Sequence, residues 1–228
     1  MFIGHFALGY AAKRSVQRTS LVTLFVAAQL ADILWPILLA LGIETVRIVP
    51  NAKPIPLEFV SYPYSHSLAT LAIMGAVFGI AYFAFTKRAR SAWIIFALVV
   101  SHWVLDWITH VPDMPLWPGG PKFGLGLWNY QTLTMVIEVG MFLVGARLYA
   151  GVRRPRDRQG RIGFWSLFFL LLVAYFANEF GGTPPSVQAI WISGILGTAV
   201  TLGLAWWSDS HRGPAHDPRR AERATGRG

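Results

Sequence analysis

The stretch Ser101-His-Trp-Val-Leu-Asp-Trp-Ile-Thr-His-Val-Pro-Asp113 combines ionisable side chains with an apolar segment typical of a membrane span. Its ionisable residues follow one another at steps of four, four and three, so a helix places them on one face. They are His102, Asp106, His110 and Asp113. Ionisable groups inside a span are costly and are retained mainly for function. Imidazole and carboxylate groups on one face are also the ligands that a divalent metal ion requires.

The composition of the 228 residues is typical of an integral membrane protein. Hydrophobic residues make up 54% of the chain, the mean hydropathy is +0.46, and only 14% of residues are charged. A soluble domain carries about a quarter charged residues. The chain has no cysteine, which excludes disulfides, thiolate metal sites and cysteine nucleophiles. Any metal ion must therefore be bound by His, Asp, Glu or main-chain groups.

Six apolar stretches are candidates for membrane spans, most of them near the roughly 20 residues that a helix needs to cross the hydrocarbon core. They cover approximately Leu21–Ile43, Leu68–Phe85, Ala92–Thr109, Thr132–Ala150, Phe164–Ala177 and Val187–Trp207. A further apolar stretch, Phe2–Ala12, is too short to cross, and it precedes its charges, unlike a signal peptide. We expect an all-α, polytopic membrane helical bundle of about six spans plus a short N-terminal helix. Residues 1–208 would form one integral membrane domain, and residues 209–228 a basic, disordered C-terminal tail.

The basic residues gather on every second loop between the predicted spans. Seventeen of the 20 Lys and Arg residues follow this pattern, and only Arg47, Lys53 and Lys122 lie on the opposite side. By the positive-inside rule, we expect both termini to be cytoplasmic in a bacterial-type inner (plasma) membrane. Loops that face anionic lipid explain the net charge of +9, so we expect the lipid bilayer, and no nucleic acid, as a partner.

Ionisable residues from other segments are expected at similar depths in the membrane. Counted at 1.5 Å per residue from the basic loops, His102 lies about 18 Å and Asp32 about 21 Å into the bundle. His5 and Glu138 lie about 13 Å in, and His66 falls near the opposite boundary. Each would be unfavourable on a lipid-facing surface. We therefore expect these residues to converge in the interior.

The order of these residues carries a family resemblance. The pattern comprises His5, Asp32, His66 within Tyr-Ser-His-Ser, His102-x-x-x-Asp106, His110, and Glu138 after a Gly-Leu-Trp-Asn segment. Over roughly residues 1–150, the chain resembles the YdjM-like family of membrane-bound, metal-dependent hydrolases. More remotely, it is similar to the zinc-dependent phospholipase C and single-strand nuclease superfamily, whose all-helical members gather a zinc cluster. Thr134 departs from that pattern, because the superfamily has a histidine four residues before the glutamate.

The resemblance implies a divalent metal ion, for which we expect zinc. It implies one complete site from Asp32, His66, His102 and Asp106, and a weaker second site from His110 and Glu138. His5 is a further candidate ligand. Zinc lowers the pKa of bound water towards about 7. Asp106 is expected to be essential for catalysis, and Asp113 or Glu138 is a candidate general base.

We therefore expect a membrane-embedded, metal-dependent hydrolase of phosphate esters, acting on a small-molecule or lipid-derived substrate. One alternative is a transporter or proton-coupled permease in which buried Asp, His and Glu residues form a proton relay. Another is a non-catalytic membrane protein with a structural metal ion. The sequence shows no internal repeat of the kind found in many transporters, which argues against the permease.

Overall fold

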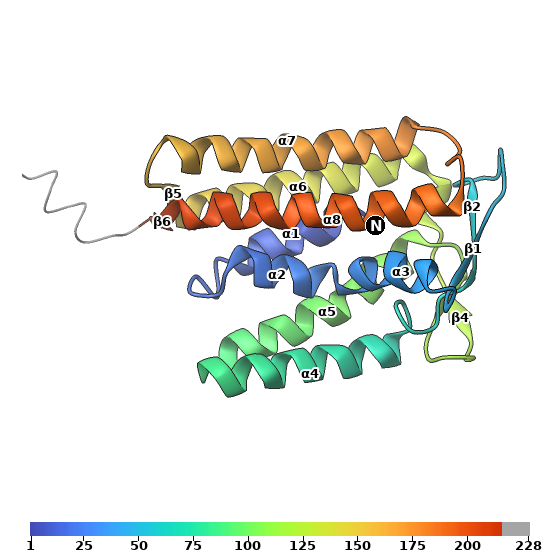
Figure 1. Cartoon of the computed structure of the whole chain (residues 1–228), viewed down its shortest axis with the longest axis horizontal. Helices are drawn as coiled ribbons and strands as arrows, with labels where there is room; N and C mark the ends of the chain where they lie inside the picture. The colour runs from blue at the N-terminus through green and yellow to red at the C-terminus, as the bar shows by residue number, and fades with distance from the viewer. Residues whose placement is uncertain (216–228) are drawn as a thin grey trace, which may run out of the picture.

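The computed structural model describes residues 1–215, and these residues form a bundle of eight α-helices (Figure 1). The helices are α1 (Ile3–Ala12), α2 (Leu21–Ala28), α3 (Leu30–Ala40), α4 (Leu68–Thr86), α5 (Ala89–Thr109), α6 (Gln131–Val152), α7 (Arg158–Phe180) and α8 (Val187–Ser210). A 3-10 turn, η1 (Leu127–Asn129), precedes α6. The predicted all-α membrane bundle with a short N-terminal helix is confirmed.

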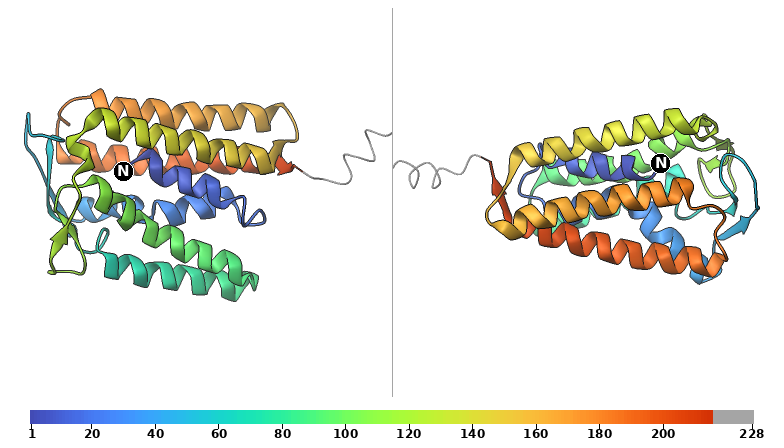
Figure 2. Two further views of the ribbon diagram at one scale, coloured as in Figure 1. Left: turned by 180° about the vertical axis from the view of Figure 1, so that it is seen from behind. Right: turned by 90° about the horizontal axis from the view of Figure 1, so that it is seen from above.

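Three short antiparallel strand pairs, the first two of them hairpins, close the two ends of the bundle. They pair β1 (Thr45–Ile48) with β2 (Leu57–Ser61), β3 (Met114–Pro115) with β4 (Lys122–Phe123), and β5 (Arg153–Pro155) with β6 (Arg212–Pro214). The first two hairpins lie at one end, which we call the loop end (Figure 1). The third pair lies at the opposite end, together with the α1–α2 and α4–α5 turns (Figure 2). This second end carries the loops in which basic residues gather, and we call it the basic end.

Five helices, α4 to α8, are each long and apolar enough to cross a membrane. The α2–α3 pair gives up to six spans, but its two helices are bent by 62° at Gln29, so the first predicted span is broken. Pro36 lies inside α3 and has no N–H to donate to the Asp32 carbonyl. The fifth predicted span, the shortest in the sequence pattern, is the 23-residue helix α7.

Helix α1 packs in the interior of the bundle, mainly against α6 and α2. It begins beside α5 and runs towards the basic end (Figure 2). Gly145 on α6 permits close packing, because a Cβ atom there would lie 2.4 Å from the carbonyl oxygen of Ala7. Aromatic rings fill the adjoining core, with Tyr10 of α1 against Phe25 and Tyr149. The fold thereby places His5 of α1 inside the bundle.

Regular structure continues past Asp209, the predicted start of the tail. We expected a tail from Asp209, but α8 continues to Ser210, and Arg212–Pro214 pairs with β5. Asp209 accepts hydrogen bonds from Lys13 Nζ at 2.7 Å and from the Tyr149 hydroxyl at 3.0 Å. These buried bonds fix the end of α8 to α1 and α6. The rest of the predicted tail, residues 216–228, lies outside the described residues.

Candidate metal centre

Five of the predicted metal ligands meet in the interior of the bundle. One group comprises His66, His102 and Asp106, whose ligand atoms all lie within 4.8 Å of one another. A second group, by the same measure, comprises His5, Asp32 and His102. The five residues come from α1, the first turn of α3, the loop before α4, and α5. The predicted convergence of distant segments is therefore present in the structure.

The imidazoles and carboxylates of this cluster face one another at short range. His102 Nε2 lies 3.1 Å from Asp106 Oδ2 and 3.7 Å from Asp32 Oδ1. His66 Nε2 lies 3.4 Å from Asp32 Oδ1 and 3.9 Å from Asp106 Oδ2. His5 Nε2 is 3.0 Å from Asp106 Oδ1, and its ring stacks on that of His102 with centroids 3.7 Å apart. Three imidazoles and two carboxylates thus share one small volume.

The hydrogen bond made by His102 fixes which of its ring nitrogens faces the cluster. Its Nδ1 lies 2.8 Å from the carbonyl oxygen of Ala28, at the last residue of α2 before the break. A carbonyl oxygen only accepts, so Nδ1 carries a proton, and in the neutral imidazole Nε2 presents a lone pair. His102 Nε2 is buried and has no hydrogen-bond partner among the described residues. The broken helix therefore orients this imidazole with an unpaired acceptor towards two carboxylates.

His66 is oriented in the same sense by a chain of two residues. The Ser65 hydroxyl donates to Glu44 Oε2 at 2.6 Å and lies 2.7 Å from His66 Nδ1. A hydroxyl has one proton, and a carboxylate only accepts, so Ser65 must accept from His66 Nδ1–H. Glu44 is buried and also accepts from the backbone N–H of Tyr64 and Ser65. In the neutral imidazole, His66 Nε2 is thus left with a lone pair that points at the cluster.

This donor set fits a bound cation. Two imidazole nitrogens and two carboxylates face one another in a largely enclosed space, and beyond the N-terminal ammonium of Met1 at Asp106 this arrangement favours a further cation. Neutral imidazole held by a hydrogen bond at its other nitrogen, together with carboxylate, is the usual protein ligand set for zinc.

Access to the cluster is on the side of Asp32. The side chain of Asp32 is 37% exposed, whereas those of His66 and Asp106 are 6% and 3% exposed. Asp32 belongs to the first turn of α3, directly after the bend. A small molecule would therefore reach the cluster past α3.

His110 and Asp113 lie outside both ligand groups. His110 Nδ1 is 3.0 Å from Asp113 Oδ1, and its ring lies 4.0 Å from that of Trp128 of η1. Burial lowers the pKa of His110 below its ordinary value, although its hydrogen bond with Asp113 acts in the opposite direction. The pair closes the loop end of α5, where Gly126 N–H donates to the His110 carbonyl.

Glu138 also lies outside the two ligand groups. Its Oε2 accepts hydrogen bonds from the backbone N–H of Phe2 at 2.7 Å and of Gly4 at 3.2 Å. These are N–H groups at the start of α1, which have no partner within the helix. Glu138 therefore fixes the helix that carries His5. Thr134, one turn earlier, donates to the carbonyl oxygens of Leu127 and Tyr130 and holds η1 against α6.

Sequence reasoning did not identify several of the cluster's neighbours. Glu44 and Ser65 support His66, and the Ala28 carbonyl supports His102. The backbone amine of Met1 contacts the Asp106 carboxylate and donates to Thr109 Oγ1 at 3.1 Å. Glu44 lies about 20 residues before the Tyr-Ser-His-Ser segment in the chain. The β1–β2 hairpin brings the two together, and the sequence alone gives no sign of this contact.

Comparison with known proteins agrees with this picture. Residues 1–183 match the model of the YdjM inner membrane protein family. No curated protein and no solved structure has significant similarity to the chain. Because the match covers well over half of the 228 residues, the chain belongs to the YdjM inner membrane protein family. With its apolar helices, this makes it a multi-pass membrane protein.

Proposed function

We propose that this member of the YdjM family is a membrane-embedded, metal-dependent hydrolase of phosphate esters. The proposed ligands of the first metal ion are Asp32, His66, His102 and Asp106, with His5 beside them. When bound, a divalent ion such as zinc supplies an activated water molecule and polarises a phosphoryl oxygen. The observation that carries the proposal is the pair of imidazole Nε2 atoms, from His66 and His102, that converge on two carboxylates.

The chain's own residues supply orientation and exclusion of water. Ala28 and Ser65 hold the two imidazoles in the ligating tautomer. Burial of the cluster strengthens the interaction of Asp106 with any positive charge placed there. The half-exposed Asp32 leaves one side open to a substrate phosphate. Asp113 and Glu138 are carboxylates outside this set, and we propose them as candidate general bases.

In this proposal the surrounding lipid bilayer is both the protein's partner and a source of substrate. Since the cluster lies among membrane helices, a lipid-derived ester can reach it without leaving the membrane, and a small soluble ester can reach it from the loop end. We propose that His110, together with Glu138, contributes to a second, weaker metal site only after local rearrangement, because neither is within the two ligand groups.

Hydrolysis by the purified protein tests the function. With zinc supplied, we expect release of product from a phosphomonoester or phosphodiester, and no turnover by Asp106→Asn. The substitution keeps the side-chain size but removes a charge at the centre of the cluster. Asp157→Asn is the matched control, because Asp157 is exposed and bonds only to His211 and to the start of α7. Equal turnover by Asp106→Asn and wild type would contradict the proposal.

A proton-coupled permease is the second candidate function. The broken α2–α3 helix favours it, because discontinuous helices form the substrate sites of many transporters. In that case the buried His and Asp residues would carry protons. Metal-independent solute flux in proteoliposomes, without ester hydrolysis across a broad substrate panel, would favour the permease over the hydrolase.

A further inference from the structure

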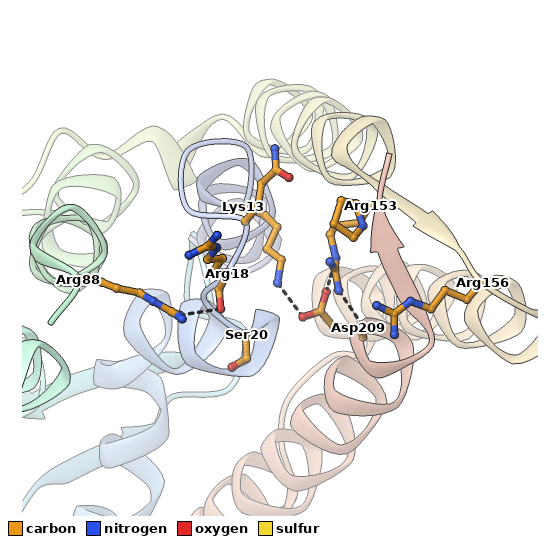
Figure 3. A pocket seen from close by; sticks show the side chains of 9 residues that line it. Lys13, Arg18, Ser20, Arg88, Arg153, Arg156 and Asp209 are labelled. Carbon is orange, nitrogen blue, oxygen red and sulfur yellow. Dashed lines mark hydrogen bonds and ion pairs between the residues drawn. The ribbon is translucent and has the colours of Figure 1, made fainter. Parts of the chain in front are cut away.

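A basic cavity lies at the basic end of the bundle (Figure 3). It has a volume of about 580 Å³ and is built by the α1–α2 turn, the α4–α5 turn, the β5–β6 strand pair and the end of α8. Its lining residues are Lys13, Gln17, Arg18, Ser20, Arg88, Arg153, Arg156, Asp209 and Pro214. Five of these side chains are cationic and one is anionic, so the cavity is strongly positive.

The single carboxylate cannot neutralise the whole cavity. Asp209 is already occupied by Lys13 Nζ at 2.7 Å and by Arg153 Nε at 3.3 Å, as the dashed lines in Figure 3 show. Arg88 donates to the carbonyl oxygen of Arg18. Among the described residues, the guanidinium groups of Arg18 and Arg156 have no hydrogen-bond or ion-pair partner. Two exposed guanidinium groups therefore stand available for an outside anion.

The cavity lies at the level where the membrane helices end. Arg88 separates α4, which ends at Thr86, from α5, and Arg153 follows the last residue of α6. Phe85 and Trp93 lie near Arg88 along the chain and are 89% and 71% exposed, as side chains that face lipid would be. Positions just beyond the ends of spans are at the depth of lipid headgroups.

We propose that this cavity binds the phosphate group of an anionic phospholipid headgroup. Guanidinium groups bind phosphate through paired, charge-assisted hydrogen bonds, so Arg18 and Arg156 would hold its oxygens from two sides. The net positive lining selects an anionic lipid over a zwitterionic one. The acyl chains would extend from the cavity along the exposed apolar side chains of the neighbouring helices.

This lipid site is separate from the candidate metal centre. His102 lies fourteen residues after Arg88, which is about 21 Å along α5. The two sites therefore lie well apart along the bundle, and no residue belongs to both. Binding at the cavity does not depend on the hydrolase proposal.

Lipid competition on the purified full-length protein tests this inference. Micelles containing equal amounts of phosphatidylglycerol and phosphatidylcholine are used, and the retained lipids are counted by native mass spectrometry. We expect one retained phosphatidylglycerol, preferred by about tenfold, because both lipids offer a phosphate but the positive lining repels the choline ammonium of phosphatidylcholine. The double variant Arg18→Gln/Arg156→Gln should lose the preference. Neither side chain has a partner within the described structure, so the fold should be unaffected.

The matched control is Arg14→Gln/Arg158→Gln, which removes two charges from exposed residues of the α1–α2 turn and of the first position of α7 that do not line the cavity. It should retain phosphatidylglycerol like the wild type. If both double variants lost the preference for phosphatidylglycerol equally, overall charge would explain the preference, and the inference would be overturned. A second arm adds excess inorganic phosphate, which should not displace the lipid. Binding of phosphate with no preference for phosphatidylglycerol would also overturn the lipid assignment.

Discussion

Glu44 acts on the candidate metal centre at a distance of two hydrogen bonds. It is 1% exposed, and its side chain accepts a hydrogen bond from the Ser65 hydroxyl. That hydroxyl in turn accepts a hydrogen bond from His66 Nδ1–H. The direction of every bond in this chain follows from the inability of a carboxylate to donate. Glu44 therefore decides which nitrogen of His66 carries the proton.

We predict that Glu44→Gln weakens metal binding by about 10- to 100-fold. A glutamine amide can donate to the Ser65 hydroxyl, which is then free to donate to His66 Nδ1. The proton of His66 would move to Nε2, the nitrogen that faces the cluster. Zinc titration against a chelating dye measures the change. Glu58→Gln is the control, because Glu58 is exposed and pairs only with Arg47. Equal affinities in the two variants would contradict the role of Glu44.

The sequence predicted contacts between residues that are close in the chain, and it missed contacts that depend on the arrangement of distant segments. His102 and Asp106 are four residues apart, so helix geometry alone places them together. Their meeting with Asp32 and His66 was predicted from depth in the membrane and from the family pattern. Glu44 and Ser65 were missed, because their roles depend on a hairpin and a loop whose arrangement no periodicity encodes. His110 and Glu138 lie outside the two ligand groups, where they hold the loop end and α1, and their role as ligands stays a prediction.

The break between α2 and α3 is the element that shapes the centre. It releases the Ala28 carbonyl to His102 and places Asp32 in the first turn of α3. An acidic residue in a first turn is also stabilised by the helix dipole. The apolar stretch Leu21–Ile43 predicted one continuous span, because hydropathy averages over about 20 residues and does not register a bend. A proline often marks a bend in a helix, but Pro36 lies seven residues beyond this bend and so does not show its position.

The contact of α1 with α6 is the second decisive element, because it holds His5 in place. We predict that Gly145→Ala lowers the free energy of unfolding by roughly 1–3 kcal/mol, since the new methyl group collides with the Ala7 backbone. Thermal unfolding in detergent measures the loss. Gly140→Ala on the same helix is the control, because nothing lies within 4 Å of its Cβ position. Similar melting temperatures for the two variants would show that α1 is free to move aside.

At the scale of the whole molecule, charge and shape agree. The loops that carry most basic residues meet at the basic end, and the β1–β2 and β3–β4 hairpins lie at the loop end (Figure 1). This separation of the two ends could be predicted from the sequence. Once the spans are counted, every second loop falls at the same end of the bundle. The buried position of Asp209 was not predictable from the sequence. Its hydrogen bonds to Lys13 and Tyr149 join residues nearly 200 and 60 positions apart in the chain.

We predict that the basic end faces the cytoplasm, as the positive-inside rule requires. A reporter fused after Thr183, between α7 and α8, should read as external, and one fused after Gly160 as internal. Topology-dependent reporter activity in intact cells measures both. The opposite pattern would invert the bundle and open the candidate centre towards the cytoplasm.

Metal content of the purified protein tests the central claim, that the buried His and Asp cluster is a metal site. Elemental analysis of the wild type should find at least one equivalent of a divalent metal, with zinc expected. His102→Ala should lose that metal and melt at a lower temperature, because a ligand is removed and the buried carboxylate of Asp106 loses a partner. His211→Ala, which removes a histidine at the basic end, should keep both. Unchanged metal stoichiometry in His102→Ala, or a wild type that binds no divalent metal, would contradict the account.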